Sequence, residues 1–190
     1  APLLLGRDNT RLVRTQWVAQ EGQFSVRSRA ELTAEDWTLH AQAEVPQEGQ
    51  STPPAVACSA LPTRAPDFDH PAHYALAAQA GLHYGPAFQR VAQGWVTGDV
   101  VQAVLRPDAH DADFLLSPMA LDAAFQLVVQ LLAQAPQNTT PMLYLPVRIA
   151  RLVCARHAAA PAAVSARCVR RSTRTLSADF QVLDAAGNVL

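Results

Sequence analysis

One stretch of the chain decides its fold: Ser117 to Gln134 read SPMALDAAFQLVVQLLAQ. Serine followed by proline is a typical helix start, because the serine can cap the helix and proline suits the first helical position. The pattern predicts a helix over 117–134. Apolar residues surround this helix nearly all the way round, whereas a helix on a protein surface has a polar half. We therefore expect the helix to be buried on most of its sides.

The segments around this helix are mostly short alternations of apolar and polar residues, which predict strands. A second helix is predicted over 69–80, ending at Gly81. An apolar helix wrapped by a curved antiparallel sheet is the simplest arrangement of these elements, and a β-sandwich would have no place for such a helix. The predicted fold class is α+β, and the predicted architecture is a hotdog fold. The expected strands are 11–18, 24–29, 37–45, 91–96, 100–105, 143–153, 163–171 and 176–183.

The composition of the chain changes between its two groups of elements. Residues 46–68 are rich in Pro, Gln, Gly and Ser, which is typical of a linker. We therefore expect a first group of strands in residues 1–50, a linker over 51–67, and a second domain over 68–190 that carries the long helix.

The overall composition excludes several classes of protein. With 190 residues and 49% hydrophobic residues, the chain can bury a core and is not disordered. Its 15 basic and 16 acidic residues leave a formal charge of -1, which gives no general electrostatic reason to bind nucleic acid. No apolar run is long enough to cross a membrane. The three cysteines lack zinc-ligand spacing, so we expect thiols in a reducing cytoplasm and no metal.

Asp122 lies inside the apolar helix, and Gln126 follows it four residues later. This spacing puts both side chains on one face of the helix, one turn apart. A carboxyl group in apolar surroundings is costly to ionise, which suits a general acid that must hold a proton near neutral pH. The amide of Gln126 would then orient the carboxyl group or bind a substrate oxygen. From spacing alone, a structural hydrogen bond from Asp122 to a neighbouring segment is the alternative.

Two further motifs flank this pair in the sequence. Residues 81–89 read GLHYGPAFQ and residues 144–147 read YLPV, with LDAAFQ at 121–126 between them. In this order the three motifs resemble the dehydratase domain of modular type I polyketide synthases. Members of that family carry Gly-x-x-Tyr-Gly-Pro-x-Phe, then Asp-x-x-x-Gln or Asp-x-x-x-His, then Leu-Pro-Val. The resemblance covers residues 16–190 and is densest over 74–150.

The resemblance implies a double hotdog, in which residues 1–50 supply closing strands of the first hotdog and residues 68–190 most of the second. It also implies a reaction, the removal of water from a 3-hydroxyacyl thioester on an acyl carrier protein to give the 2-enoyl thioester. The family's general acid falls on Asp122, and its glutamine partner falls on Gln126. The positions that contact substrate or line the acyl tunnel fall on Tyr84, Gly85, Pro86, Phe88, Leu145, Pro146 and Val147.

The family also has a histidine base, in the motif His-x-x-x-Gly-x-x-x-x-Pro on the first hotdog. None of the six histidines of this chain is followed four residues later by glycine. Both ends of the sequence look like cuts into a longer polypeptide. We therefore expect the base to lie before residue 1 and the fragment by itself to be inactive.

The resemblance implies partners but no bound cofactor. The substrate would arrive on the phosphopantetheine of an acyl carrier protein, with neighbouring synthase domains beside it, and a homodimer is left open. Weaker site candidates are His83 as a catalytic group and the pair His70 and His73 as metal ligands. Arg167, Arg170, Arg171 and Arg174 are either a solvated strand face or a docking surface for an acidic carrier.

Two other functions remain open at this point. In the first, the chain is part of a double-hotdog domain that does not dehydrate. Such a domain would be a product-template-like cyclase, a pyran-forming variant or a structural pseudo-dehydratase. Alternatively it would be an interaction scaffold in which Asp122 is structural. The presence of the histidine motif in the parent polypeptide separates the dehydratase from the first of these.

Overall fold

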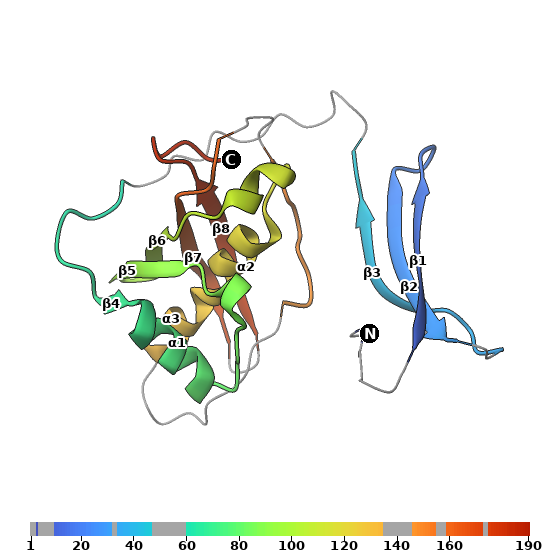
Figure 1. The fold of residues 1–190 in the computed structure, drawn as a ribbon, viewed down its shortest axis with the longest axis horizontal. Coiled ribbons are helices and arrows are strands. Elements are labelled where there is room, and N and C mark those ends of the chain that lie inside the picture. The colour runs from blue at the N-terminus through green and yellow to red at the C-terminus, as the bar shows by residue number, and fades with distance from the viewer. Residues whose placement is uncertain are drawn as a thin grey trace. The chain divides into compact units, whose positions relative to one another are not determined.

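The structure is a computed structural model of the chain. It describes Leu3 and residues 10–31, 34–46, 60–134, 146–154, 159–172 and 175–190. Contacts along the chain divide it into two compact units, Ala1–Pro54 and Ala55–Leu190 (Figure 1). The boundary between the units falls inside the stretch 51–67, whose composition is typical of a linker.

The first unit contains a three-stranded antiparallel sheet in the order β1-β2-β3. Its strands are β1 (Arg11–Val18), β2 (Gln23–Ala30) and β3 (Thr38–Glu44), so the three strands expected from the alternation are confirmed. Gly22 ends the turn between β1 and β2 with a φ of 61°, a conformation that glycine adopts without strain. The carbonyl oxygen of Gly22 accepts a hydrogen bond from the Val45 N–H at 2.7 Å, which ties this turn to the end of β3.

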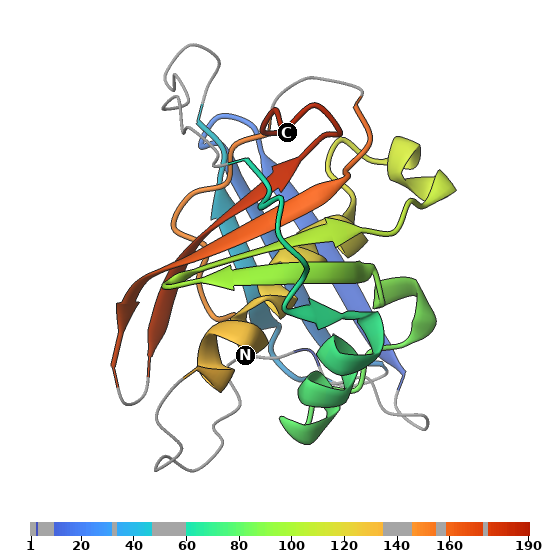
Figure 2. The ribbon, with the colours of Figure 1, turned by 90° about the vertical axis from the view of Figure 1, so that its left-hand side faces the viewer.

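The second unit contains a five-stranded sheet in the order β4-β5-β6-β7-β8, and every neighbouring pair is antiparallel (Figure 2). A tight turn with Gly98 at a φ of 56° joins β5 to β6, as the Thr97-Gly98-Asp99 sequence predicts. The strands are β4 (Phe68–Asp69), β5 (Val91–Thr97), β6 (Val100–Leu105), β7 (Ala163–Arg171) and β8 (Leu176–Leu183).

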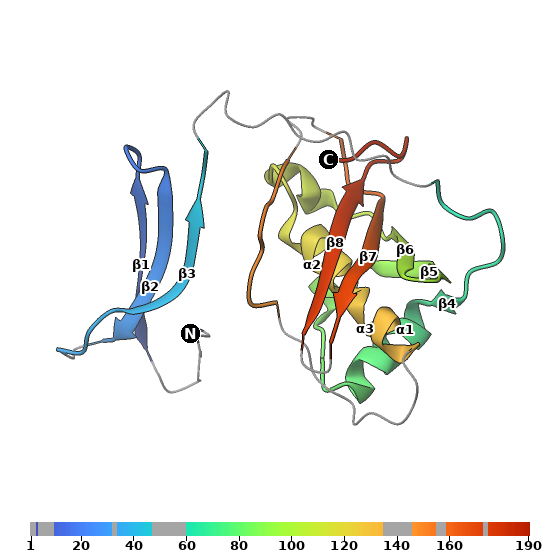
Figure 3. The ribbon, with the colours of Figure 1, turned by 180° about the vertical axis from the view of Figure 1, so that it is seen from behind.

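The long helix expected over 117–134 is present, but it forms two segments, α2 (Pro118–Gln126) and α3 (Val128–Ala133). Seen from behind, β7 and β8 cross in front of α2 (Figure 3). The two segments meet at Leu127, whose N–H donates to the Ala124 carbonyl three residues back at 3.2 Å. This bond tightens the helix by a local 3-10 turn, which the apolar pattern could not reveal.

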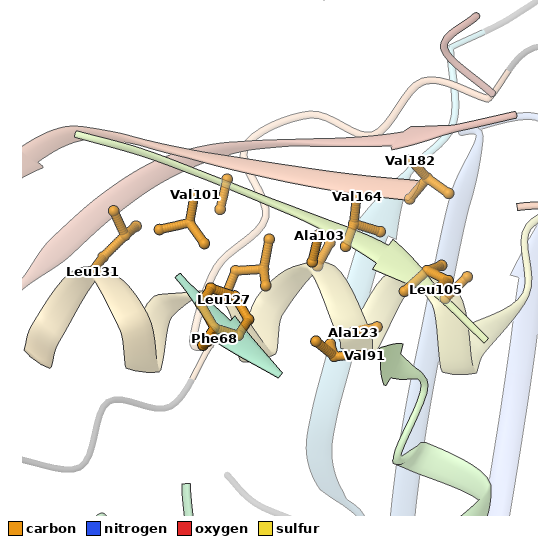
Figure 4. Packing of buried hydrophobic residues seen from close by; sticks show 13 residues of the cluster. Phe68, Val91, Val101, Ala103, Leu105, Ala123, Leu127, Leu131, Val164 and Val182 are labelled. Atoms are coloured by element: carbon orange, nitrogen blue, oxygen red, sulfur yellow. The ribbon is translucent and has the colours of Figure 1, made fainter. Parts of the chain in front are cut away.

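The core of the second unit lies between this helix and one face of the sheet. Ala120, Ala123, Ala124 and Leu127 are fully buried, and small alanines let the helix approach the strands closely. Figure 4 shows side chains from β6, β7 and β8 pointing toward Leu127 and Leu131 of the helix. The strand residues of this cluster are Phe68, Val91, Val101, Ala103, Leu105, Val164, Ala166 and Val182. The helix is therefore buried by the sheet, as its apolar sequence predicts.

The helix expected over 69–80 is α1 (His70–Gln79), and the Asp69 side chain caps it by accepting from the Ala72 N–H at 2.9 Å. Gly81 follows the helix with a φ of 84° and donates to the Ala78 carbonyl at 3.0 Å. Leu82 donates to the Ala77 carbonyl at 2.9 Å, which completes a Schellman ending. This ending sets the direction in which residues 82–90 leave the helix.

The strand expected over 143–153 is wrong where the structure describes it, because residues 146–154 contain no strand. The part of the prediction that falls on residues 143–145 lies outside the described residues. Val147 and Ile149 alternate with polar residues there as in a strand, but both side chains are exposed. Among the described residues, no helix is both long enough and apolar enough to cross a membrane.

Candidate active site

Asp122 is held on α2, one turn after the start of the helix. The Ser117 hydroxyl caps α2 by accepting from the Ala120 N–H at 3.4 Å, and Pro118 takes the first helical position, as the sequence predicts. Ala120, Ala123 and Ala124, which lie close to Asp122 on α2, are buried in the core, and the Asp122 side chain is half-buried. The Asp122 carboxyl group therefore lies on the helix that packs against the sheet, but it is not fully buried in the core.

Gln126 lies one turn further along α2 and donates from Nε2 to Oδ2 of Asp122 at 2.7 Å. The prediction that the two side chains share one helix face is confirmed by this bond. The same Nε2 atom also donates to the carbonyl oxygen of Phe88 at 2.9 Å. Gln126 is only 1% exposed, so its amide belongs to the protein interior and fixes the carboxyl group from one side.

Tyr74 of α1 completes the hydrogen bonds of this amide, and sequence reasoning missed it. The Tyr74 hydroxyl donates to Oε1 of Gln126 at 2.9 Å and accepts from the Val91 N–H at 3.0 Å. Burial raises the pKa of Tyr74 to about 12, so the hydroxyl keeps its proton at neutral pH. A clue was available in the sequence, because a tyrosine inside an alanine-rich helix needs a partner for its hydroxyl.

Tyr84 approaches the same cluster from the segment that follows α1. Its ring lies 6.0 Å from the Tyr74 ring, centroid to centroid, at an interplanar angle of 72°. Burial and then the negative charge of Asp122 raise the pKa of Tyr84 to about 12. The segment is held by Gln89, whose Nε2 donates to the Tyr84 carbonyl at 2.8 Å. Tyr84 is therefore an electrostatic neighbour of Asp122, while its contact with substrate stays a prediction.

The rest of the motif around Tyr84 forms the short 3-10 helix η1 (Pro86–Phe88). Gly85 precedes this helix, and its carbonyl accepts from the Phe88 N–H at 3.0 Å. The Phe88 carbonyl receives the Gln126 amide, so the turn of Gly85 and Pro86 aims a backbone acceptor at the site. The Phe88 ring is partly exposed. The motif thus supplies a backbone acceptor to the site, and a pattern of side chains does not indicate such a contact directly.

Of the third predicted motif, the structure describes only Pro146 and Val147. Leu145 lies outside the described residues, and Pro146 is exposed. Val147 is 95% exposed, so its side chain contacts almost nothing. An open groove of about 290 Å³ lies between the β5–β6 turn, the end of α3 and β7, and Asp122 does not line it. A channel formed by Leu145, Pro146 and Val147 beside Asp122 therefore stays a prediction.

The two histidines of α1 have structural partners. Nδ1 of His70 is 2.8 Å from the Val91 carbonyl oxygen, and Nδ1 of His73 is 3.1 Å from Nε2 of Gln130. His73 is fully buried, and this burial lowers its pKa to about 4, so the ring is neutral at neutral pH. Within the described residues, no group of three or more His, Cys, Asp or Glu side chains is arranged to hold a metal ion.

Comparisons of the sequence with known proteins point to one family. The sequence model described as polyketide synthase dehydratase N-terminal domain matches residues 53–190. Spectinabilin polyketide synthase system protein NorA' of Streptomyces orinoci is 33% identical over 134 residues, which are 65% of this chain and 4% of that protein. Spectinabilin polyketide synthase system protein NorB of the same organism is 32% identical over 110 residues, or 56% of this chain and 5% of that protein.

A solved structure gives the same fold. The dehydratase domain (DH) of a mycocerosic acid synthase-like (MAS-like) PKS, in crystal form 1, matches with a TM-score of 0.68 at 23% identity. The match covers 95% of this chain and 65% of that one, so the chain spans about two thirds of the solved domain. The predicted α+β hotdog fold is confirmed. The assignment of residues 68–190 to the second hotdog stays a prediction, since the family description names the N-terminal domain.

The fold and the sequence comparisons agree on the region that carries the site. The matched residues 53–190 include all of the second unit that the structure describes, with α1, α2 and the segment of Tyr84. The match extends over more than half of the chain. The chain belongs to the polyketide synthase dehydratase family.

Proposed function

We propose that this chain is the part of a dehydratase domain that supplies the general acid for dehydration of a 3-hydroxyacyl thioester on an acyl carrier protein. The product is the 2-enoyl thioester, formed during polyketide chain extension. The observation that carries this proposal is the hydrogen bond from Gln126 to Asp122 on a helix buried in a dehydratase fold. The family match and the fold support a dehydration role for the domain.

The reaction needs one proton removed and one proton delivered. A base takes the proton from the α carbon, which the thioester makes acidic, and the electron pair forms the new carbon–carbon double bond. The bond from the β carbon to the hydroxyl oxygen breaks, and Asp122 donates its proton so that the oxygen leaves as water. A general acid in this position contributes roughly 10²–10⁴ to the rate.

We propose that the base comes from outside the described site. His73 of α1 contacts Gln130 of α3, but its side chain is fully buried and cannot reach a substrate. His70 is engaged with the Val91 carbonyl. We therefore propose that the base is a histidine in polypeptide that precedes residue 1, as the family motif implies. By itself this chain is then inactive.

The proposed partners follow from the substrate. An acyl carrier protein presents the intermediate on its phosphopantetheine arm, and neighbouring synthase domains supply and remove it. The relatives from Streptomyces orinoci are much longer than the region they share with this chain, which agrees with a domain inside a multifunctional synthase.

Replacement of Asp122 by asparagine tests the proposal. Asp122→Asn keeps the shape and the hydrogen bond from Gln126 but has no acidic proton. In the synthase polypeptide that carries this chain, we expect kcat for a 3-hydroxyacyl carrier protein to fall about 10²–10⁴-fold. Loss of one water from the acyl group is followed by mass spectrometry, and circular dichroism checks the fold.

Asp113→Asn is the matched control, since Asp113 is exposed and lies at the end of η2 (Ala109–Asp113). It should leave kcat unchanged. Full activity of Asp122→Asn would remove the general-acid role and leave a domain that shapes or binds the acyl chain.

A further inference from the structure

We infer that Tyr74 is a positioning residue that selects which carboxyl oxygen of Asp122 carries the catalytic proton. It acts through the side-chain amide of Gln126 and does not touch the substrate. The inference rests on the proposed role of Asp122 as general acid. It assigns a function to a residue of α1 that lies outside the three motifs.

The orientation of the Gln126 amide is fixed by its partners. One end of the amide lies 2.7 Å from Oδ2 of Asp122 and 2.9 Å from the carbonyl oxygen of Phe88. The Phe88 carbonyl can only accept a hydrogen bond, so this end must be the NH₂ group, which has two protons to donate. The other end is then the amide oxygen, and it lies 2.9 Å from the Tyr74 hydroxyl.

Tyr74 can serve this oxygen because its own hydroxyl is also fixed. The Val91 N–H donates to the hydroxyl oxygen at 3.0 Å and so leaves the hydroxyl proton free to point at Gln126. The Phe88 carbonyl lies at 3.3 Å, further than Gln126, and is already occupied by the amide. The rings of His70 and His73 flank the phenol edge-on, at centroid distances of 4.8 and 4.9 Å.

This arrangement decides the position of the proton on Asp122. Because Gln126 presents N–H to Oδ2, that oxygen acts as an acceptor, and the proton of the acid is held on Oδ1. Oδ1 is the oxygen left for the departing hydroxyl of the substrate. A flipped amide would present its own oxygen to Asp122 and would accept the acidic proton. The proton would then be held between Asp122 and Gln126 instead of facing the substrate.

Tyr74 acts against this flip together with the Phe88 carbonyl. In the flipped orientation the NH₂ group would face a hydroxyl whose oxygen already accepts from Val91, and the amide oxygen would face the Phe88 carbonyl. The second contact opposes two acceptors inside the core, where water cannot relieve it because Gln126 is almost fully buried, and the flip also gives up the hydrogen bond from Tyr74 to the amide oxygen. Without the hydroxyl, the amide oxygen loses its donor, the observed orientation is less favoured, and the flipped amide becomes more populated.

The test is a double-mutant cycle in the synthase polypeptide that carries this chain. Tyr74→Phe should lower kcat for a 3-hydroxyacyl carrier protein by about tenfold and leave KM unchanged, because orientation is lost but no substrate contact is removed. In a Gln126→Met background, which has no amide to orient, Tyr74→Phe should cause no further loss of kcat. If Tyr74→Phe does not fold, Tyr74→Met, which also lacks the hydroxyl, takes its place in the cycle.

The cycle separates this role from a structural one. If the hydroxyl only supports the Val91 backbone, Tyr74→Phe lowers kcat by the same factor with and without Gln126, and the inference is overturned. A rise in KM at constant kcat overturns it as well. Asp122→Asn is measured in parallel: if that variant stays active, the general-acid proposal has failed, whereas an inactive Asp122→Asn beside a fully active Tyr74→Phe rejects the positioning role alone.

Discussion

Arg90 and Asp111 form a two-point ion pair inside the second unit. Nη1 of Arg90 donates to Oδ1 of Asp111 at 2.9 Å and Nη2 donates to Oδ2 at 2.8 Å, and the residues are 3% and 6% exposed. Burial acts to raise the pKa of Asp111, but hydrogen bonds from Arg90 and Ser117 outweigh it and hold this pKa below its ordinary value. Ser117 caps α2, so the pair is linked to the start of the helix that carries Asp122.

We expect Asp111→Asn to destabilise the chain strongly, because it leaves the Arg90 charge buried without its anion. The loss is of the order of 3–5 kcal/mol in the free energy of unfolding. Urea denaturation followed by tryptophan fluorescence measures it. Asp67→Asn is the comparison, since Asp67 pairs with Arg64 on the surface. If Asp111→Asn and Asp67→Asn unfold at the same urea concentration, the buried ion pair does not stabilise the fold more than the surface pair does.

A second prediction concerns His73 and acid. Burial lowers the pKa of His73 from 6.5 to about 4 in the folded chain, while the unfolded chain has the ordinary value. Between these values the unfolded state binds the extra proton, so stability is fully present above pH 6.5 and is lost as pH falls toward 4. The lowering corresponds to about 3 kcal/mol in the free energy of unfolding. Urea midpoints measured from pH 7 to pH 4 should show this loss.

His73→Gln should make the stability less dependent on pH over this range, because glutamine does not titrate. His110→Gln is the matched control: His110 is exposed, and its hydrogen bond to Asp108 raises its pKa, which is the opposite direction. That variant should keep the acid loss of the parent chain. Parallel pH curves for the parent and His73→Gln would show that His73 does not cause the loss.

Much of this fold could be predicted because the information is local. The apolar circumference of 118–133 required a covering sheet, and the alternation in 163–171 and 176–183 gave two strands with their observed bounds. The contact between Asp122 and Gln126 follows from helical spacing alone. Where the same local rule was applied to 143–153, it gave a strand that residues 146–154 do not form.

The rest of the site depends on contacts between distant parts of the chain. Tyr74 reaches Gln126 across 52 residues of sequence, and no periodicity connects them. The Phe88 carbonyl acts through its backbone, so the identity of the side chain says nothing about this bond. Such contacts depend on how α1 packs beside α3, which no local sequence pattern specifies.

The last prediction concerns Gly94 in the middle of β5. Phe68 of β4 pairs with Gly94, and a Cβ atom at position 94 would meet the Phe68 ring and the carbonyl oxygen of Gln102. The Phe68 ring cannot move away freely, because it stacks on His73 with 5.5 Å between ring centroids. Gly94→Ala should therefore cost about 1–3 kcal/mol in the free energy of unfolding through overpacking.

Two further variants define this effect. Gly85→Ala adds the same methyl group where no heavy atom lies within 4 Å and where φ is -71°, so it should unfold close to the parent urea midpoint. Phe68→Leu placed in the Gly94→Ala background removes the ring edge but not the Gln102 carbonyl, so it should recover part of the loss. Equal urea midpoints for Gly94→Ala and Gly85→Ala would mean that β4 and β5 separate easily. The Phe68 ring would then not hold α1, and with it Tyr74, against the sheet.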